Sequence, residues 1–251
     1  MNFHTFGDRE RPVIVLIHGV LTPWQVWEKQ IEHFEKEYCV VAVALDAHEE
    51  ERSSDFVSID DEARKIEDYI LQNHGGEVYA ICGISMGGAI THIIWKNRRI
   101  KAQKYVLDGA PLVPFGKLMC WVMTHNYINI IIKSKQRDKR ILNSFKKNFL
   151  PERFLDTYLK IADNMRESSV KHMITSVCGS NVCTDVESDG AEVMFLHGTK
   201  GNEALAKKSA VLVKKHYPKC MVVCFDGYKH CEAAIYEQDK WIRYVEEFFE
   251  R

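Results

Sequence analysis

Residues 77–94, EVYAICGISMGGAITHII, give the clearest structural signal in the chain. Residues 78–82 form a short apolar run typical of a buried strand, and residues 88–95 carry apolar side chains at helical spacing. Between them, residues 83–87 fit the pattern G-x-S-x-G, which places Ser85 at a sharp turn from strand to helix. Glycines on both sides of the serine allow the two backbones to pass close to each other. The stretch therefore predicts that Ser85 is a nucleophile.

A serine at such a turn has two interpretations. The plain one is a glycine-rich turn, because glycine and serine are common residues. The strand before the turn and the helix after it favour the catalytic interpretation, since this motif has meaning only in that context. The first free N–H groups of the helix, beginning with that of Met86, then favour negative charge in front of the serine. Met86 is thus predicted to supply half of an oxyanion hole.

Composition limits the kind of protein this can be. The chain has 251 residues, 46% of them hydrophobic, which suits one large α/β domain with room for an inserted subdomain. Its formal charge is −1, so no global field favours nucleic acid or a membrane surface, and a small-molecule substrate is expected. The first twelve residues lack the features of a secretory signal, and the apolar-leaning stretch 119–132 is too short and too interrupted to span a bilayer. We expect a cytoplasmic protein with no nucleic-acid partner and no stable membrane association; its oligomeric state is not predicted.

The eight cysteines are expected to be free thiols. Several of them fall in apolar runs, where cysteine behaves as a small hydrophobic residue, and a cytoplasmic chain keeps its thiols reduced. The pairs Cys178–Cys183 and Cys220–Cys224 could suggest metal ligands, but neither has C-x-x-C spacing or a matching second pair. No metal and no cofactor are predicted.

The order of elements predicts an α/β fold with a mostly parallel sheet. Apolar runs that read as strands alternate with segments of helical period, as expected for right-handed crossover units. The predicted strands are 13–17, 39–45, 78–82, 105–107, 193–196 and 221–225, and the predicted flanking helices are 24–38, 59–73, 88–97, 203–216 and 233–249. Ser58, three residues before Asp61, is expected to cap the helix that starts at residue 59.

The alternation stops at Pro111. From there to about residue 177 only helical segments are found, predicted at 116–133, 139–148 and 152–174. We therefore divide the chain into a core of residues 1–110 and 178–251, and a helical lid (cap) insertion of residues 111–177.

Taken together, these features resemble the α/β-hydrolase superfamily, and in particular its lid-bearing branch of serine esterases and lipase-like enzymes. The resemblance covers nearly the whole chain. The residues that carry it are the strand ending in His18-Gly19, the elbow around Ser85, the strand ending at Asp108, the strand ending in His197-Gly198, and the segment GYKHCE around His230. It implies an α/β-hydrolase fold and a Ser-acid-His order of catalytic residues along the chain.

His230 is the predicted general base. A serine hydroxyl becomes a good nucleophile only when a base takes its proton and a carboxylate orients that base. His230 lies in a loop beyond the carboxyl end of a predicted strand, where ligands collect in open parallel sheets, and flexible Gly227 precedes it. The alternative is an ordinary histidine in a surface loop.

The acid is predicted less directly. The resemblance implies an aspartate three residues after the glycine of the His197-Gly198 turn, but that position is Gly201. Glu203 lies two residues further on, and the extra methylene of a glutamate extends its reach, so Glu203 is the first choice. Asp108 is the alternative acid, because some members of the superfamily carry theirs after this strand.

The resemblance also assigns the oxyanion loop and suggests a pocket. It gives His18-Gly19 the role of shaping the loop, and it gives the N–H of Val20 a place beside that of Met86 in the oxyanion hole. Apolar residues near this loop and at the start of the insertion are predicted to bind an apolar part of the substrate: Trp24, Leu118, Met119 and Trp121, with Trp27, Phe115 and Met123 nearby. The alternative is that these side chains pack the insertion onto the core.

The predicted activity is hydrolysis of carboxylic esters of a small, largely apolar substrate through an acyl-enzyme on Ser85. A serine at this position excludes hydrolases of the same fold that use an aspartate nucleophile. Thioester, C–C bond and peroxidase-like chemistry remain open, and so does the natural substrate. The alternative function is a ligand receptor or weakly active interaction protein on the same fold.

Overall fold

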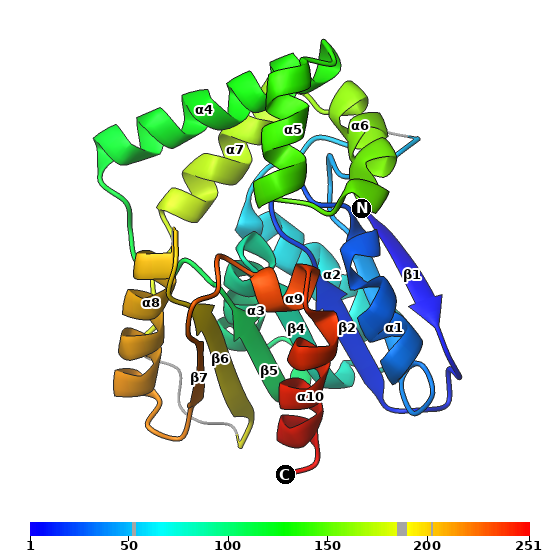
Figure 1. Ribbon diagram of the computed structural model, residues 1–251. Helices are drawn as coiled ribbons and strands as arrows, with labels where there is room; N and C mark the ends of the chain where they lie inside the picture. Colours follow the sequence, from blue (N-terminus) through cyan, green and yellow to red (C-terminus); the bar gives the residue numbers. More distant parts are fainter. Residues whose placement is uncertain (52–53, 185–189, 202) are drawn as a thin grey trace.

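The computed structural model describes residues 1–51, 54–184, 190–201 and 203–251. Its centre is a seven-stranded sheet in the order β1-β3-β2-β4-β5-β6-β7 (Figure 1). The strands are β1 (Asn2–Phe6), β2 (Val13–Ile17), β3 (Cys39–Ala44), β4 (Glu77–Ile84), β5 (Lys101–Asp108), β6 (Glu192–Gly198) and β7 (Met221–Phe225). All neighbouring strands are parallel except β1, which pairs antiparallel with β3. The predicted mostly parallel α/β sheet is confirmed.

Helices cover both faces of the sheet. Helices α1 (Glu28–Phe34) and α10 (Gln238–Phe249) lie on one face, and α2 (Ile59–Asn73) and α3 (Met86–Asn97) lie on the other (Figure 1). Helix α8 (Glu203–His216) connects β6 to β7, while the short helices η1 (Trp24–Trp27) and α9 (Glu232–Ile235) precede α1 and α10. Every residue of β2 and β3 is buried, which explains their unbroken apolar sequences. Ser58 caps α2 as predicted, because its side chain accepts a hydrogen bond from the N–H of Asp61.

Strand β1 has no counterpart among the predicted strands. Its residues, NFHTF, are mostly half-buried at the edge of the sheet and lack the continuous apolar run of the inner strands. Such a strand is held mainly by pairing with β3, from Asn2 opposite Ala44 to Phe6 opposite Val40. Pairing of this kind leaves little trace in local sequence.

The insertion is helical, and it lies beyond the carboxyl ends of the central strands (Figure 1). It contains α4 (Lys117–Lys135), α5 (Lys139–Asn148), η2 (Glu152–Phe154), α6 (Leu155–Asn164) and α7 (Glu167–Cys178). The predicted single helix 152–174 is therefore divided, since Met165 and Arg166 adopt extended backbone between α6 and α7. The two connections of the insertion meet where the N–H of Phe115 donates to the carbonyl of Cys178 at 2.9 Å.

Among the helices of the described residues, none is both long and apolar enough to cross a membrane.

Candidate active site

Ser85 stands at the turn from β4 to α3 in a strained backbone conformation. Its φ is 53°, a left-handed value that is uncommon for a residue with a side chain. The N–H of Ser85 donates to the carbonyl of Asp108 at 2.7 Å, which fastens the turn to the end of β5. The turn is thus fixed between the two central strands.

The glycines of the elbow are required by space. A Cβ on Gly83 would clash with the backbone of Gly87 and the hydroxyl of Thr91, and a Cβ on Gly87 would clash with the carbonyl of Ile17. The predicted close approach of strand and helix is confirmed. The two glycines of the motif are thus needed for the close packing that holds Ser85 at the carboxyl edge of the sheet.

The structure brings Ser85, His230 and Glu203 together. His230 Nε2 lies 2.9 Å from Ser85 Oγ, and His230 Nδ1 lies 2.5 Å from Glu203 Oε1. Because a carboxylate oxygen accepts a hydrogen bond, Nδ1 carries the proton and donates it in a hydrogen bond to Glu203. Nε2 is then free to accept the hydroxyl proton of Ser85. The side chain of His230 is 36% exposed while that of Glu203 is 1% exposed. The acid is therefore buried behind a base that solvent and small molecules can reach.

Glu203 is held by a second contact that the sequence did not reveal. Its other oxygen, Oε2, accepts from the N–H of Gly198 at 2.5 Å. A Cβ on Gly198 would clash with the carbonyl of Tyr228, and that carbonyl accepts from the N–H groups of Thr199 and Lys200. The loop after β6 and the loop that carries His230 are therefore packed backbone to backbone. This packing sets the distance between acid and base.

Gly109, directly after β5, makes room for the base. Its φ is +61°, and a Cβ there would lie 2.8 Å from Cε1 of His230 and 2.9 Å from Sγ of Cys231. The imidazole of His230 therefore lies against a stretch of bare backbone, which any larger residue would displace.

Asp108, the alternative acid, has a different partner. It is 2% exposed, and its Oδ2 accepts from the indole N–H of Trp241 at 3.0 Å. Burial, and after it the nearby charge of Glu203, raise the pKa of Asp108 to about 7. Glu203, and not Asp108, is the residue that hydrogen-bonds to His230.

The predicted oxyanion donors lie on either side of Ser85. Met86 begins α3 directly after it, and Val20 follows Gly19, on which a Cβ would lie 3.2 Å from Cβ of Ser85. Within the described residues, no acceptor is recorded for the N–H of Val20 or of Met86. Two N–H groups of the loop and the helix are therefore available next to the serine.

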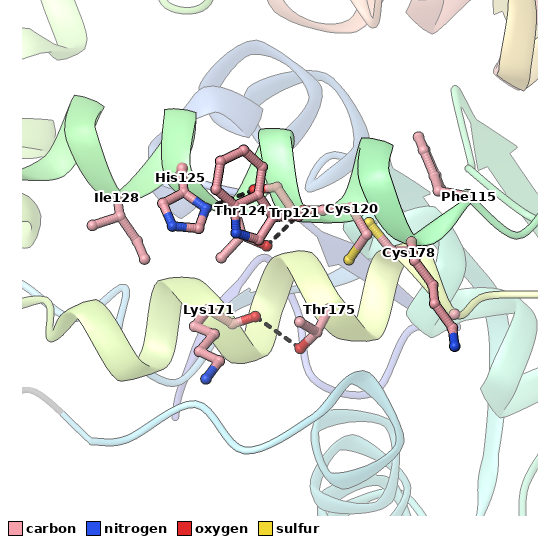
Figure 2. A pocket seen from close by; sticks show the side chains of 11 residues that line it. Phe115, Cys120, Trp121, Thr124, His125, Ile128, Lys171, Thr175 and Cys178 are labelled. Carbon is pink, nitrogen blue, oxygen red and sulfur yellow. Dashed lines mark hydrogen bonds between the residues drawn. The ribbon is translucent and has the colours of Figure 1, made fainter.

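The predicted pocket residues at the start of α4 are exposed, and Trp24 packs on β1. Leu118, Met119 and Trp121 are 76%, 54% and 59% exposed at the start of α4. Trp24 stacks on His4 with ring centroids 4.2 Å apart. Trp121 instead lines a groove of about 610 Å³ between α4 and α7, together with Phe115, Cys120, His125, Lys171 and Cys178 (Figure 2). The conformation described here leaves the apolar start of α4 open to solvent.

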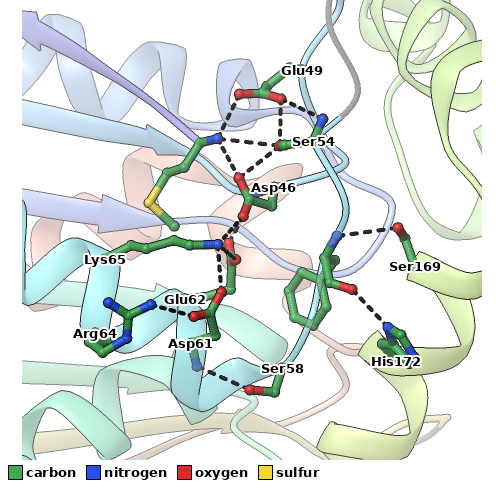
Figure 3. A network of polar contacts seen from close by, with 12 residues as sticks. Asp46, Glu49, Ser54, Ser58, Asp61, Glu62, Arg64, Lys65, Ser169 and His172 are labelled. Carbon is green, nitrogen blue, oxygen red and sulfur yellow. Dashed lines mark hydrogen bonds and ion pairs between the residues drawn. The ribbon is translucent and has the colours of Figure 1, made fainter.

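One cluster of carboxylates resembles a metal site. Oxygens of Asp46, Asp61 and Glu62 all lie within 4.8 Å of one another. The ammonium of Lys65 forms ion pairs with all three, at 2.5 Å from Asp61 and 3.6 Å from Glu62 (Figure 3). Because Lys65 already supplies a positive charge there, we assign no metal to this cluster.

Comparison with known proteins agrees with this architecture. Residues 12–135 match the family model described as alpha/beta hydrolase fold. A solved α/β-hydrolase family protein from Desulfitobacterium hafniense is 20% identical, with a TM-score of 0.76 over 98% of this chain and 99% of that one. A structure described with the carboxylesterases of Nitrososphaera gargenis is 15% identical, with a TM-score of 0.80 over 99% and 93% of the two chains. An enol-lactonase from Burkholderia xenovorans LB400 is 14% identical, with a TM-score of 0.76 over 100% and 96%. No curated protein matched the sequence.

The chain has the α/β-hydrolase fold, as the resemblance in its sequence implied, and the family match over residues 12–135 agrees with that fold.

Proposed function

We propose that this protein is a serine hydrolase that cleaves carboxylic esters of small, largely apolar molecules through an acyl-enzyme on Ser85. The observation that carries the proposal is the hydrogen-bonded series from Glu203 through His230 to Ser85. Similar solved structures described with carboxylesterases and as an esterase add support at the level of the fold.

The proposed mechanism assigns one task to each group. His230 Nε2 takes the proton of Ser85 as Oγ attacks the ester carbonyl, and the ionised Glu203 stabilises the imidazolium that results. The N–H groups of Val20 and Met86 donate to the oxyanion, each contributing about 3 kcal/mol of transition-state stabilisation. His230 then protonates the leaving alcohol, and a water activated in the same way releases the acid.

A fluorophosphonate probe tests the proposal directly. The wild-type protein should be labelled at Ser85 and should hydrolyse p-nitrophenyl esters, whereas Ser85→Ala and His230→Ala should lose nearly all turnover while remaining folded. A panel that includes thioesters and lactones would define which carbonyl compounds are cleaved. Absence of both labelling and turnover in the wild type would instead favour the ligand-binding alternative.

We further propose that residues 111–177 act as a lid over a core domain of residues 1–110 and 178–251, and that its start supplies an apolar wall for the acyl chain. The exposed side chains of Leu118, Met119 and Trp121 support this, because a lid must carry apolar surface that is free in an open state.

The chain-length profile of Trp121→Ala tests the lid. We expect kcat/KM for octanoate relative to acetate esters to change by more than about 3-fold, since each buried methylene contributes about 0.8 kcal/mol. Val211→Ala is the matched control, as Val211 is 62% exposed on α8 outside the insertion. If Trp121→Ala keeps the wild-type profile as Val211→Ala does, the start of α4 forms no part of the acyl pocket.

A further inference from the structure

His48 lies behind the oxyanion loop, in the segment between β3 and α2. It follows β3 and is 1% exposed. Its Nε2 accepts from the N–H of Leu21 at 3.1 Å, and its Nδ1 lies 3.0 Å from the carbonyl of Asp46. A carbonyl only accepts, so Nδ1 carries the proton and Nε2 is the acceptor.

The contact is one half of a reciprocal pair. His18, at the start of the oxyanion loop, accepts at Nε2 from the N–H of Leu45 at 3.2 Å, and its Nδ1 lies 2.8 Å from the carbonyl of Gly19. The imidazole of His48 thus accepts from a backbone N–H of the oxyanion loop, and the imidazole of His18 accepts from a backbone N–H at the end of β3. The rings of His18 and His48 meet edge to face with centroids 4.6 Å apart.

His48 remains an acceptor at neutral pH. Burial lowers its pKa to about 4, so the imidazole is neutral through the range in which a serine hydrolase works. Replacing the ring by a group that cannot accept would leave the buried N–H of Leu21 without a partner, which is unfavourable.

The loop that carries His48 is itself fixed by the polar network of Figure 3. The N–H of Asp46 donates to Glu62 Oε2 at 2.9 Å, the hydroxyl of Ser54 donates to Asp46 Oδ1 at 2.7 Å, and Lys65 contacts Asp46 Oδ2. The N–H of His48 closes a turn onto the carbonyl of Leu45 at 3.0 Å. His48 therefore projects from a segment that several hydrogen bonds hold in place.

The oxyanion loop needs such support. Leu21 has a φ of 57°, a left-handed value that a leucine seldom adopts without being held there. On the other side, the N–H of Gly19 donates to the hydroxyl of Thr22 at 3.0 Å, and that hydroxyl donates to the carbonyl of Gly19 at 2.9 Å. Val20 lies between these two attachments, with its own N–H left for a substrate.

We propose that His48 is a positioning residue that holds the backbone of Leu21 and thereby directs the N–H of Val20 at the substrate oxyanion. The inference rests on the proposed serine hydrolase function. His48 acts through the loop, so its loss weakens stabilisation of the transition state and leaves binding of the ground state nearly intact.

The test compares two amide substitutions that differ by one methylene. His48→Gln can place its amide oxygen where Nε2 lies and accept from Leu21, whereas the shorter His48→Asn cannot reach it. Hydrolysis of p-nitrophenyl acetate is measured for each, and kcat is expressed per Ser85 labelled at the end point of fluorophosphonate reaction, so that only folded sites are counted. We expect His48→Asn to lower kcat about 10- to 100-fold with KM changed less than about 3-fold, and His48→Gln to stay within about 3-fold of the wild type.

His92→Asn is the matched control. His92 is also buried, burial lowers its pKa to about 4, and its Nε2 accepts from the N–H of Cys183 at 3.3 Å, away from the oxyanion loop. This substitution should lower stability and leave kcat per labelled site within about 3-fold. A loss of kcat equal to that of His48→Asn would mean that losing any buried imidazole acceptor harms catalysis, and would overturn the assignment.

Other outcomes separate the inference from the function on which it rests. A wild type that neither labels nor turns over ends both proposals. A wild type that does both, with His48→Asn keeping wild-type kcat or changing only KM, ends the inference alone. If His48→Asn does not fold, His48→Phe, which keeps a ring beside His18, carries the same expected loss. ¹⁵N-histidine spectra of the wild type give a further check, because a proton found on Nε2 of His48 would rule out the bond to Leu21.

Discussion

The sequence left the choice of the acid open, whereas the structure defines the contacts of both carboxylate oxygens of Glu203. The motif predicted Ser85 as the nucleophile, and the place of His230 after the last strand predicted it as the base. The choice of Glu203 over Asp108 depended on the reach of one methylene. Its second attachment, to the N–H of Gly198, arises because two loops far apart in sequence pack together, and no local pattern records such a contact.

Amide substitution can distinguish the roles of Glu203 and Asp108. We predict that Glu203→Gln lowers kcat by about 10²-fold or more, because a neutral amide neither fixes the tautomer of His230 nor balances its charge. Asp108→Asn should cost less, since the hydrogen bond of Asp108 is to Trp241 and not to the base. Steady-state kinetics of the two variants compare the losses of kcat. A larger loss in Asp108→Asn would assign the role of the acid to Asp108.

Asp108 should also give the protein a pH-dependent stability. Its folded-state pKa of about 7 lies above the ordinary value of 3.8, so the native state keeps a proton that the unfolded chain releases. The free energy of unfolding should therefore fall by the order of a few kcal/mol as pH rises from about 4 to about 7. Asp108→Asn should make this decline shallower; burial also raises the pKa of Glu62, to about 8, so Glu62 still contributes to it.

Urea unfolding at several pH values measures the effect of Asp108. Asp239→Asn, at a side chain 86% exposed, is the control and should keep the wild-type slope. If Asp108→Asn also keeps that slope, Asp108 is ionised in the folded protein near neutral pH.

Elements were predicted well where their own side chains determine them. Strands β2 and β7 and helices α2, α5 and α8 have the predicted limits, because an unbroken apolar run or a helical period with a cap is a local signal. The predicted helices 24–38 and 233–249 are each divided in two, as 152–174 is, and β5 begins four residues before its predicted start. Strand β1, which was not predicted, depends on pairing with β3, a partner distant in sequence. The arrangement of the insertion over the sheet had no signal in the sequence beyond its length and helical period.

The elbow between β4 and α3 gives a prediction about packing. Gly83→Ala should destabilise the protein by about 3 kcal/mol, because the added methyl would clash with the backbone of Gly87 and the hydroxyl of Thr91. Gly116→Ala, at the start of the insertion, should change stability by less than about 0.5 kcal/mol, since nothing lies within 4 Å of the added Cβ. Denaturant midpoints of the two variants compare them, and equal midpoints would mean that the elbow can relax around a side chain.

At the scale of the whole molecule, the cysteines differ in burial, so their reactivity can be used to probe the packing of the chain. All eight carry free thiols in the structure. Cys224 is exposed, Cys120 and Cys183 are half-buried, and the remaining five are buried: Cys39, Cys82, Cys178, Cys220 and Cys231. Burial also raises the pKa of Cys178 and Cys220 to about 12, and it raises the pKa of Cys82 and Cys231 well above the usual value of a thiol, which depletes the reactive thiolate.

We therefore predict three kinetic classes in reaction of the native protein with an aromatic disulfide reagent. Cys224 should react first, the two half-buried thiols more slowly, and the five buried ones only at the rate of unfolding, because the sheet and its helices must separate to expose them. Cys224→Ser should remove the fast phase alone. In denaturant without reductant the count should reach eight; a smaller count would reveal a disulfide and would contradict the expectation of a reducing compartment. Reaction of the buried thiols at the rate of Cys224 would show instead that the core opens far more readily than its packing indicates.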